Sequence, residues 1–482
     1  MTGTVLACER LSVAYGISAT VVEDVSLSIA AGECLALVGP SGSGKTTIAR
    51  AILGLLPQGA RISGRLTVQG MDVLSLAETE LRQLRGKAIG YVAQDPYQAC
   101  DPLRTVHDHV ASAWTVHGQR PAVDVIGDRL AQAGIADATQ AMVQYPHQWS
   151  GGMLQRASIA AATAHAPALL VADEPTSALD ADRADAILAA IKASGSAILL
   201  ISHDLELVLR HADRIALCQG GRIVETGTAQ KLSSSSSPYA RALFAATAHP
   251  VRRPNRRQGA VCVSGQSLSR RYAGRAALSD CDITVETGVI LGITGPSGCG
   301  KSTLLRLLAG LERPDAGTLE RSATLARPGA IMPVFQDPVA SLDSRWPIWR
   351  SLTEPLTAPH RPPLSQKHRR AQADIALGRL GLGGIDRESL PGELSSGQCQ
   401  RVSVARATIA RPALILADEP TSALDTIARR QVLDLLSTAA QNGTAVVLVS
   451  HDRHMLAHVA DQVLVMQEGR LIDDGSSAAV AE

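Results

Sequence analysis

Residues 39–47 read GPSGSGKTT, and almost the same nine residues, GPSGCGKST, return at 295–303. Both stretches fit the pattern G-x-x-x-x-G-K-[ST]. Its glycines let the backbone curve around a phosphate chain, so that N–H groups and the start of the next helix face the phosphate oxygens. The lysine neutralises the β- and γ-phosphates, and the hydroxyl after it can ligate Mg²⁺. One match can be chance or a structural loop, but two predict a pair of ATP-binding loops.

We expect these loops to hold the nucleotide through their glycines, hydroxyls and lysine. In the first loop the residues are Gly39, Ser41, Gly42, Gly44, Lys45, Thr46 and Thr47, and in the second they are Gly295, Ser297, Gly298, Gly300, Lys301, Ser302 and Thr303.

The rest of the chain is duplicated in the same order. SGGMLQR at 150–156 returns as SSGQCQR at 395–401, ADEPTSALD at 172–180 returns at 417–425, and SHD at 202–204 returns at 450–452. The second copy is shorter between its lysine and Gln336 than the first is between Lys45 and Gln94. Such a repeat predicts two domains, residues 1–230 and 261–482, joined by a linker at 231–260 that carries a serine run and a cluster of four arginines at 252–257.

Each copy alternates strand-like and helix-like segments. Strand-like segments at 5–13 and 33–38 precede the first loop, and 46–56 has helical spacing. ALLVADEP and ALILADEP are short apolar runs that end in acids, as expected for strands of a parallel sheet buried on both faces. The stretches between Gln94 and Ser150 and between Gln336 and Ser395 are mainly helical in pattern. The chain is therefore expected to have an α/β fold with a helical subdomain in each copy.

Two neighbouring acids end each of these strands. Asp173 and Asp418 are placed to hold Mg²⁺ through a water molecule, and Glu174 and Glu419 can orient the water that attacks the γ-phosphate or accept its proton. An acid pair that caps the next helix is the structural alternative.

Composition narrows the class of function. The formal charge is +1 and aromatic residues make up 2%, which disfavours nucleic acid as a partner. No apolar run reaches the roughly 18 residues of a membrane-spanning helix, and the first residues do not form a secretory signal. The eight cysteines have no paired spacing, so we expect reduced thiols and no iron–sulfur centre.

The order of the motifs resembles that of ATP-binding cassette (ABC) ATPases, and the resemblance covers nearly the whole chain. In each copy the order is the glycine loop, a glutamine, SGGM or SSGQ, ADEP, SALD and SHD. This resemblance implies two tandem P-loop NTPase domains. Each would have a mostly parallel RecA-like sheet core, an antiparallel β subdomain and a helical subdomain. It also implies that the two domains pair head to tail within the chain. Each ATP would lie between the glycine loop of one domain and the SGGM or SSGQ stretch of the other, which we call the signature segment.

Carried onto this sequence, the resemblance gives two composite sites with Mg²⁺. Site one would use Lys45, Gln94, Asp173, Glu174 and His203 with Ser395 and Gly397. Site two would use Lys301, Gln336, Asp418, Glu419 and His451 with Ser150 and Gly152. The catalytic groups implied are Glu174, His203, Glu419 and His451, and the metal ligands are Thr46, Gln94, Asp173, Ser302, Gln336 and Asp418.

Three further pairs have a role implied by the family and a plain alternative. Tyr15 and Tyr272 would lie against adenine, or be half-buried strand residues. His203 and His451 would sense the γ-phosphate, or be core histidines. Asp180 and Asp425 would contact across the domain pair, or cap helices.

Two positions depart from the family pattern. Trp149 replaces the usual leucine before the first signature, and Ser396 replaces a glycine in the second. Because Gly397 and Glu174 are retained, we expect site one to hydrolyse ATP, while the relative turnover of the two sites stays open.

Four segments are similar to the importer ATPases of the dipeptide, oligopeptide and nickel group, namely 94–106, 336–343, 145–153 and 237–243. That resemblance implies two membrane permease subunits, an extracytoplasmic solute-binding protein, and a peripheral position on the cytoplasmic side of the inner membrane. A fused sugar-importer ATPase and a soluble ABC-type ATPase acting on ribosomes or nucleic acid are the alternatives. The solute, whether peptide, nickel or another metal chelate, stays open.

Overall fold

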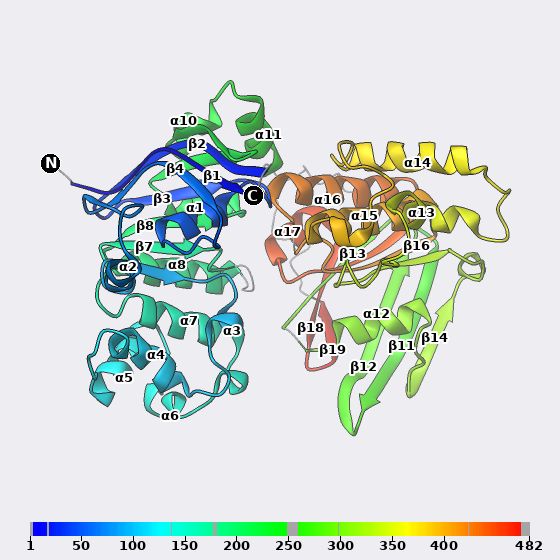
Figure 1. The fold of residues 1–482 in the computed structure, drawn as a ribbon. Helices are drawn as coiled ribbons and strands as arrows, with labels where there is room; N and C mark the ends of the chain where they lie inside the picture. The colour runs from blue at the N-terminus through cyan, green and yellow to red at the C-terminus, as the bar shows by residue number, and fades with distance from the viewer. Residues whose placement is uncertain are drawn as a thin grey trace. The chain divides into compact units, whose positions relative to one another are not determined.

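The structure, a computed structural model, describes residues 3–16, 19–135, 137–176, 181–247, 259–296, 298–422 and 424–473. The chain divides into two compact units, Met1–Ala245 and Ala246–Glu482. Figure 1 shows the ribbon of each unit, and the two are described separately below.

A mostly parallel sheet of six strands forms the centre of the first unit. Its strand order is β10-β9-β3-β8-β7-β6, and only the β9–β10 pair is antiparallel. Every residue of β3, β7 and β8 is buried, as expected for parallel strands covered on both faces. The strands are β3 (Cys34–Val38), β6 (Ile89–Val92), β7 (Leu169–Asp173), β8 (Ala197–Ser202), β9 (Arg214–Gln219) and β10 (Arg222–Gly227).

An antiparallel sheet packs against the helix that follows the first glycine loop. It has the order β2-β1-β4-β5, with β1 (Thr4–Tyr15), β2 (Ala19–Ala30), β4 (Arg61–Val68) and β5 (Met71–Asp72). Leu6 of β1, Leu35 of β3 and Ile48 of α1 (Lys45–Ile52) belong to one hydrophobic core. The helix that follows the loop therefore shares one hydrophobic core with both sheets.

The helical subdomain of the first unit has a core of its own. It comprises α3 (Pro96–Ala99), α4 (Val106–Thr115), α5 (Val123–Gln132), α6 (Ala138–Met142), the 3-10 turn Pro146–Gln148 and α7 (Gly151–Ala162). Val110, Ile126 and Leu154 pack there with Trp149, which is 3% exposed. The tryptophan that departs from the family pattern is thus a core residue. In Figure 1 these helices gather at the end of the unit away from β1 and β2.

The second unit repeats this plan. Its main sheet has the order β15-β16-β17-β13-β18-β19, in which only β18–β19 is antiparallel, and its small sheet is β12-β11-β14. The strands are β11 (Val261–Tyr272), β12 (Arg275–Glu286), β13 (Ile290–Thr294), β14 (Ala316–Arg321), β15 (Ile331–Val334), β16 (Leu414–Asp418), β17 (Ala445–Val449), β18 (Gln462–Gln467) and β19 (Arg470–Asp473).

Its helices are α12 (Lys301–Ala309), α13 (Ile348–Thr353), α14 (Gln366–Arg379), α15 (Ser396–Ile409), α16 (Thr426–Gln441) and α17 (Arg453–Val459), with 3-10 turns at Ala323–Leu325, Glu354–Thr357 and Pro391–Glu393. Together with the sheets, they confirm the α/β class and the parallel, antiparallel and helical parts expected of each copy.

The shorter spacing in the second copy falls between β14 and β15. The first unit has β5 and α2 (Glu78–Leu84) at this place, and the second has only the 3-10 turn Ala323–Leu325. Both units cap the end of the helix after the glycine loop with an arginine. Arg85, just after α2, donates to the carbonyl oxygens of Leu53 and Gly54, and Arg321 of β14 donates to those of Leu307 and Leu308.

The first unit continues through α8 (Ala181–Ala193) and α9 (Leu205–His211) to α10 (Ala229–Ser233) and α11 (Pro238–Thr247). Helix α11 lies within the stretch 231–260 taken as a linker, and its Ala240 and Leu243 are buried. The arginine cluster at 252–257 lies outside the described residues. No helix in the described ranges combines the length and apolar character needed to cross a membrane.

Candidate nucleotide sites

Both glycine loops join a buried strand to a helix, and both are pressed against a neighbouring backbone. A Cβ atom on Gly39 would lie 2.2 Å from the carbonyl oxygen of Cys218 in β9, and one on Gly295 would lie 2.1 Å from that of Met466 in β18. Gly44 and Gly300 cap the helices with φ of 94° and 114°. A side chain at any of these four positions would clash or strain the backbone, so the loops require glycine.

The lysine of each loop folds back over the loop. Lys45 Nζ donates to the carbonyl oxygens of Gly39 at 2.8 Å and Pro40 at 2.9 Å. Lys301 Nζ donates to those of Gly295 at 2.7 Å and Pro296 at 2.8 Å. The two ammonium groups therefore lie over the glycine loops, which the sequence predicts to bind phosphate. Thr47 and Thr303 lie in the first turn of the helices, and Gly42 and Gly298 have left-handed φ of 79° and 78° in open space.

A hydroxyl and a carboxylate meet beside each lysine. Ser302 Oγ donates to Asp418 Oδ2 at 2.7 Å, and Thr46 makes the corresponding hydrogen bond to Asp173. Burial raises the pKa of both aspartates, while these hydrogen bonds oppose the rise. Asp173 Oδ1 is buried and has no hydrogen-bond partner among the described residues. Hard oxygen donors that include an unsatisfied carboxylate oxygen fit a divalent cation such as Mg²⁺.

The two glutamates turn toward the histidines. Glu174 and Glu419 have left-handed φ of 47° and 50°. Their N–H groups donate to Ile201 in β8 and Val449 in β17, at 2.9 and 3.0 Å. This backbone turn directs each carboxylate out of its strand, at a cost of about 1–3 kcal/mol in backbone strain.

Each glutamate carboxylate then contacts its histidine. His203 Nδ1 lies 3.2 Å from Glu174 Oε1, and His451 Nδ1 lies 2.9 Å from Glu419 Oε2. The helix-capping alternative is wrong for the second pair, because Asp425 caps α16 through the N–H of Ala428.

The charges of these pairs depend on each other. Burial on its own raises the pKa of Glu174, but the hydrogen bond and charge of His203, together with Lys45, bring it below its ordinary value. The hydrogen bond to Glu419 raises the pKa of His451. Glu174 is thus held as a carboxylate, the form that can accept a proton.

The glutamines differ between the copies. Gln94, just after β6, donates through Nε2 to Glu174 Oε2 at 2.9 Å. Gln336, just after β15, is exposed, and in the described part of the chain no hydrogen bond joins it to Glu419. The structure therefore brings Gln94 to its glutamate and leaves Gln336 apart.

The signature serines begin long helices. Ser150 caps α7, and its Oγ accepts from Met153 N at 3.4 Å; Ser395 caps α15 and accepts from Gln398 N at 3.3 Å. Gly152 and Gly397 lie in the first turns, where N–H groups and the helix dipole favour an anion. Ser396 is the first residue of α15.

The remaining predicted residues have different surroundings. Tyr15 ends β1 and is half-buried against the core, whereas Tyr272 ends β11 and is 38% exposed. Asp425 has the capping role that was its alternative, while Asp180 and Ser297 lie outside the described residues.

Reasoning from the sequence passed over Arg270 and Glu312, which contact Tyr272. Aligning the two copies would have marked both, because the first copy has Val13 and Leu56 at those places.

Comparison with known proteins gives the same assignment for both copies. The family model described as ABC transporter matches residues 22–177 and 278–422. The chain is 36% identical over its whole length to the ABC transporter ATP-binding protein YejF of Escherichia coli (strain K12), covering 97% of that protein. It is 33% identical to the oligopeptide transport ATP-binding protein OppD of Mycobacterium tuberculosis (strain ATCC 25618 / H37Rv), over 96% of this chain and 92% of OppD.

Among solved structures, the complex of the archaeal ribosome recycling factor aABCE1 with the ribosomal stalk protein aP1 aligns with 96% of this chain and 89% of that chain, with a TM-score of 0.68. The sequence identity is 21%, so this likeness shows the fold alone. The family match and the two full-length relatives show more. The chain belongs to the ABC transporter ATP-binding proteins, which hydrolyse ATP to power transport, and it carries two ATP-binding regions in one polypeptide.

Proposed function

We propose that this chain is the ATPase of an importer for short peptides. The observation that carries the proposal is the duplication of one set of reactive residues, in which each glycine-loop lysine is accompanied by a strand-end Asp–Glu pair and a histidine that contacts the glutamate. The likeness to OppD over nearly the whole chain supports a peptide cargo.

In this proposal the residues of each unit divide the work of hydrolysis. Lys45 and Lys301 exchange their loop carbonyls for phosphate oxygens when ATP enters. The Thr46–Asp173 and Ser302–Asp418 pairs would hold Mg²⁺, with Gln94 and Gln336 as the further ligands expected from the sequence, and the ion would supply positive charge against the phosphates. Glu174 and Glu419 orient the attacking water and accept its proton, and His203 and His451 hold those carboxylates in place.

The two units complete each other's sites. We infer that Ser395 and Gly397 meet the nucleotide held by Lys45, and that Ser150 and Gly152 meet the one held by Lys301. A hydroxyl and N–H groups at the start of α7 or α15 then stabilise the γ-phosphate only when the units close. ATP favours the closed state because it binds that state more tightly, and hydrolysis releases it.

Closure needs a membrane partner to become transport. The proposed partners are two integral membrane permease subunits and, through them, an extracytoplasmic solute-binding protein, with this chain peripheral on the cytoplasmic side of the inner membrane. No nucleic acid partner is proposed.

The test is uptake by cells that lack this chain, supplied either with the wild type or with the Glu174→Gln Glu419→Gln double variant. We expect uptake of a labelled tripeptide to return with the wild type alone. The wild-type chain should be recovered from membranes with two integral membrane proteins. A loss confined to nickel or maltose uptake would show that the cargo is wrong, and recovery with ribosomes instead of membranes would overturn the importer assignment.

A further inference from the structure

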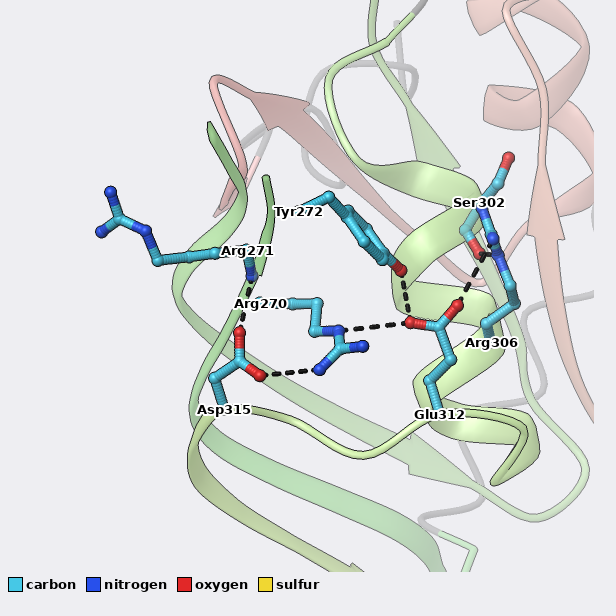
Figure 2. Close-up of polar contacts among 7 residues, drawn as sticks. All are labelled: Arg270, Arg271, Tyr272, Ser302, Arg306, Glu312 and Asp315. Atoms are coloured by element: carbon cyan, nitrogen blue, oxygen red, sulfur yellow. Dashed lines mark hydrogen bonds and ion pairs between the residues drawn. The ribbon is translucent and has the colours of Figure 1, made fainter. Parts of the chain in front are cut away.

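Tyr272 is held by charged side chains in a way that Tyr15 is not. Its hydroxyl donates a hydrogen bond to the carboxylate of Glu312, which lies just after α12. The guanidinium carbon of Arg270 stands 5.1 Å from the centre of the tyrosine ring. Figure 2 shows the hydroxyl pointing at Glu312, with Arg270 between Glu312 and Asp315.

The same arginine is itself fixed from both sides. Arg270 Nε lies 3.3 Å from Glu312 Oε2, and Arg270 Nη1 lies 2.6 Å from Asp315 Oδ1. The N–H of Arg271 also donates to Asp315 Oδ2 at 2.7 Å. With two carboxylates holding it, the guanidinium stays on one face of the ring, and a base can stack only on the other face.

Glu312 also connects the tyrosine to the helix of the glycine loop. Arg306 of α12 donates through Nη1 to Glu312 Oε1 at 3.3 Å and through Nε to the carbonyl oxygen of Ser302 at 3.3 Å. Ser302 is the residue whose hydroxyl bonds Asp418. A continuous polar chain, drawn in part in Figure 2, thus runs from the ring of Tyr272 to the proposed metal ligands.

The first unit has no counterpart to this anchor at the equivalent positions. Val13, two residues before Tyr15, is fully buried, and Leu56, at the same distance from its lysine as Glu312, packs partly buried in the same core as Tyr15. The first tyrosine is therefore held by apolar packing and the second by charge.

We propose that Glu312 is a positioning residue of the second nucleotide site, which fixes the ring of Tyr272 so that it stacks on the base of the bound nucleotide. This inference rests on the proposed function, in which Lys301 binds ATP phosphates. Among the described residues, Glu312 contacts Tyr272 and Arg270 directly and reaches the helix of the glycine loop through Arg306, so its main effect falls on the base end of the nucleotide.

The experiment distinguishes the contribution of the base to nucleotide affinity from that of the phosphates. In the full chain with Lys45→Ala, which leaves only the second site, calorimetry measures the affinity for two probes in Mg²⁺: AMP-PNP, a non-hydrolysable ATP analogue, and inorganic tripolyphosphate. We expect Glu312→Gln to weaken AMP-PNP binding about fivefold, the lower end of what a base–aromatic stack contributes, and to leave tripolyphosphate unchanged. Tyr272→Phe should have the same effect, and the double variant should bind no more weakly than either single one, because the two residues act as one unit.

The matched control is Glu320→Gln, an exposed carboxylate of β14 in the same unit, which should bind both probes like the parent. Equal AMP-PNP affinity for Glu312→Gln and the parent would overturn the inference, and so would equal weakening of both probes or additive losses in the double variant. If Lys301→Ala leaves AMP-PNP binding intact, or the parent binds none, the proposed function fails and the inference fails with it.

Discussion

Nδ1 of His451 lies 2.9 Å from Oε2 of Glu419, at the end of β16. The hydrogen bond and the charge of Glu419 raise the pKa of this histidine, with a smaller contribution from Asp452, while burial and Arg429 act against the rise. A histidine whose pKa is raised on folding stabilises the native state in its protonated form. The pair therefore links the stability of the second unit to pH.

The first prediction concerns that link. The contribution of His451 to the free energy of unfolding is complete below its ordinary pKa of 6.5, and it is lost as pH rises through the higher native value. The urea midpoint of the wild type should therefore fall between pH 6 and pH 8, within roughly the range where histidines titrate, by more than that of His451→Gln. A wild type and variant with parallel midpoints across this range would show that the pair makes no such contribution.

The second prediction tests whether the two units share their sites. Lys45→Ala Ser395→Ala removes two groups that we assign to site one, so site two should keep turning over ATP. Lys45→Ala Ser150→Ala removes one group from each site, and ATPase activity should fall by roughly 10²-fold or more relative to the first pair, because γ-phosphate charge loses its donors at both sites. Each double variant carries one Lys→Ala and one Ser→Ala change, so each serves as the other's control. Equal activity of the two would exclude the head-to-tail arrangement.

The third prediction concerns the metal. Ser302→Ala removes the hydroxyl that bonds Asp418 and leaves that half-buried carboxylate without this donor, so the Mg²⁺ concentration that gives half-maximal ATPase activity should rise in a chain with Lys45→Ala. Ser302→Thr should behave like the parent, because threonine occupies this place in the first loop as Thr46. Equal half-maximal Mg²⁺ concentrations for Ser302→Ala and Ser302→Thr would show that this hydroxyl is not part of the metal site.

The fourth prediction concerns the fit of the first loop. Gly39→Ala places a Cβ 2.2 Å from the carbonyl oxygen of Cys218, so the loop or β9 has to shift, and overpacking of this kind costs about 1–3 kcal/mol. We expect a lower thermal midpoint and weaker nucleotide binding. Gly378→Ala, in α14 with open space around it, should instead be neutral or stabilising by about 0.5–1 kcal/mol. Equal thermal midpoints for Gly39→Ala and Gly378→Ala would show that the loop accommodates a Cβ atom at Gly39 without loss of stability.

Local patterns carried most of what the sequence could predict. The glycine loops and the strands ending at Asp173 and Asp418 are fixed by residues close together in the chain, and they lie where the pattern placed them. The helix expected over 46–56 ends earlier, at Ile52, because Leu53 is its C-cap and Gly54 turns left-handed with φ of 63°.

Contacts between distant segments were harder to foresee. Gln94 and Gln336 are both followed by Asp-Pro, yet among the described residues only Gln94 is hydrogen-bonded to its glutamate. Likewise, the partnership of Tyr272 and Glu312 joins residues from different elements, and their spacing along the chain carries no periodic signal. Such placements follow from packing of the whole unit.

The arginine caps on α1 and α12 bear on how the two halves can be recombined. Arg85 reaches its helix from the end of α2, whereas Arg321 reaches its helix from β14. A chimera that exchanged the segment from β5 to Arg85 for the turn at Ala323–Leu325, but left β4 and β14 in place, would give the end of α12 two competing guanidinium groups and the end of α1 none. Despite their common origin in one repeated plan, the halves are transplantable only as larger blocks that carry each helix together with its own cap.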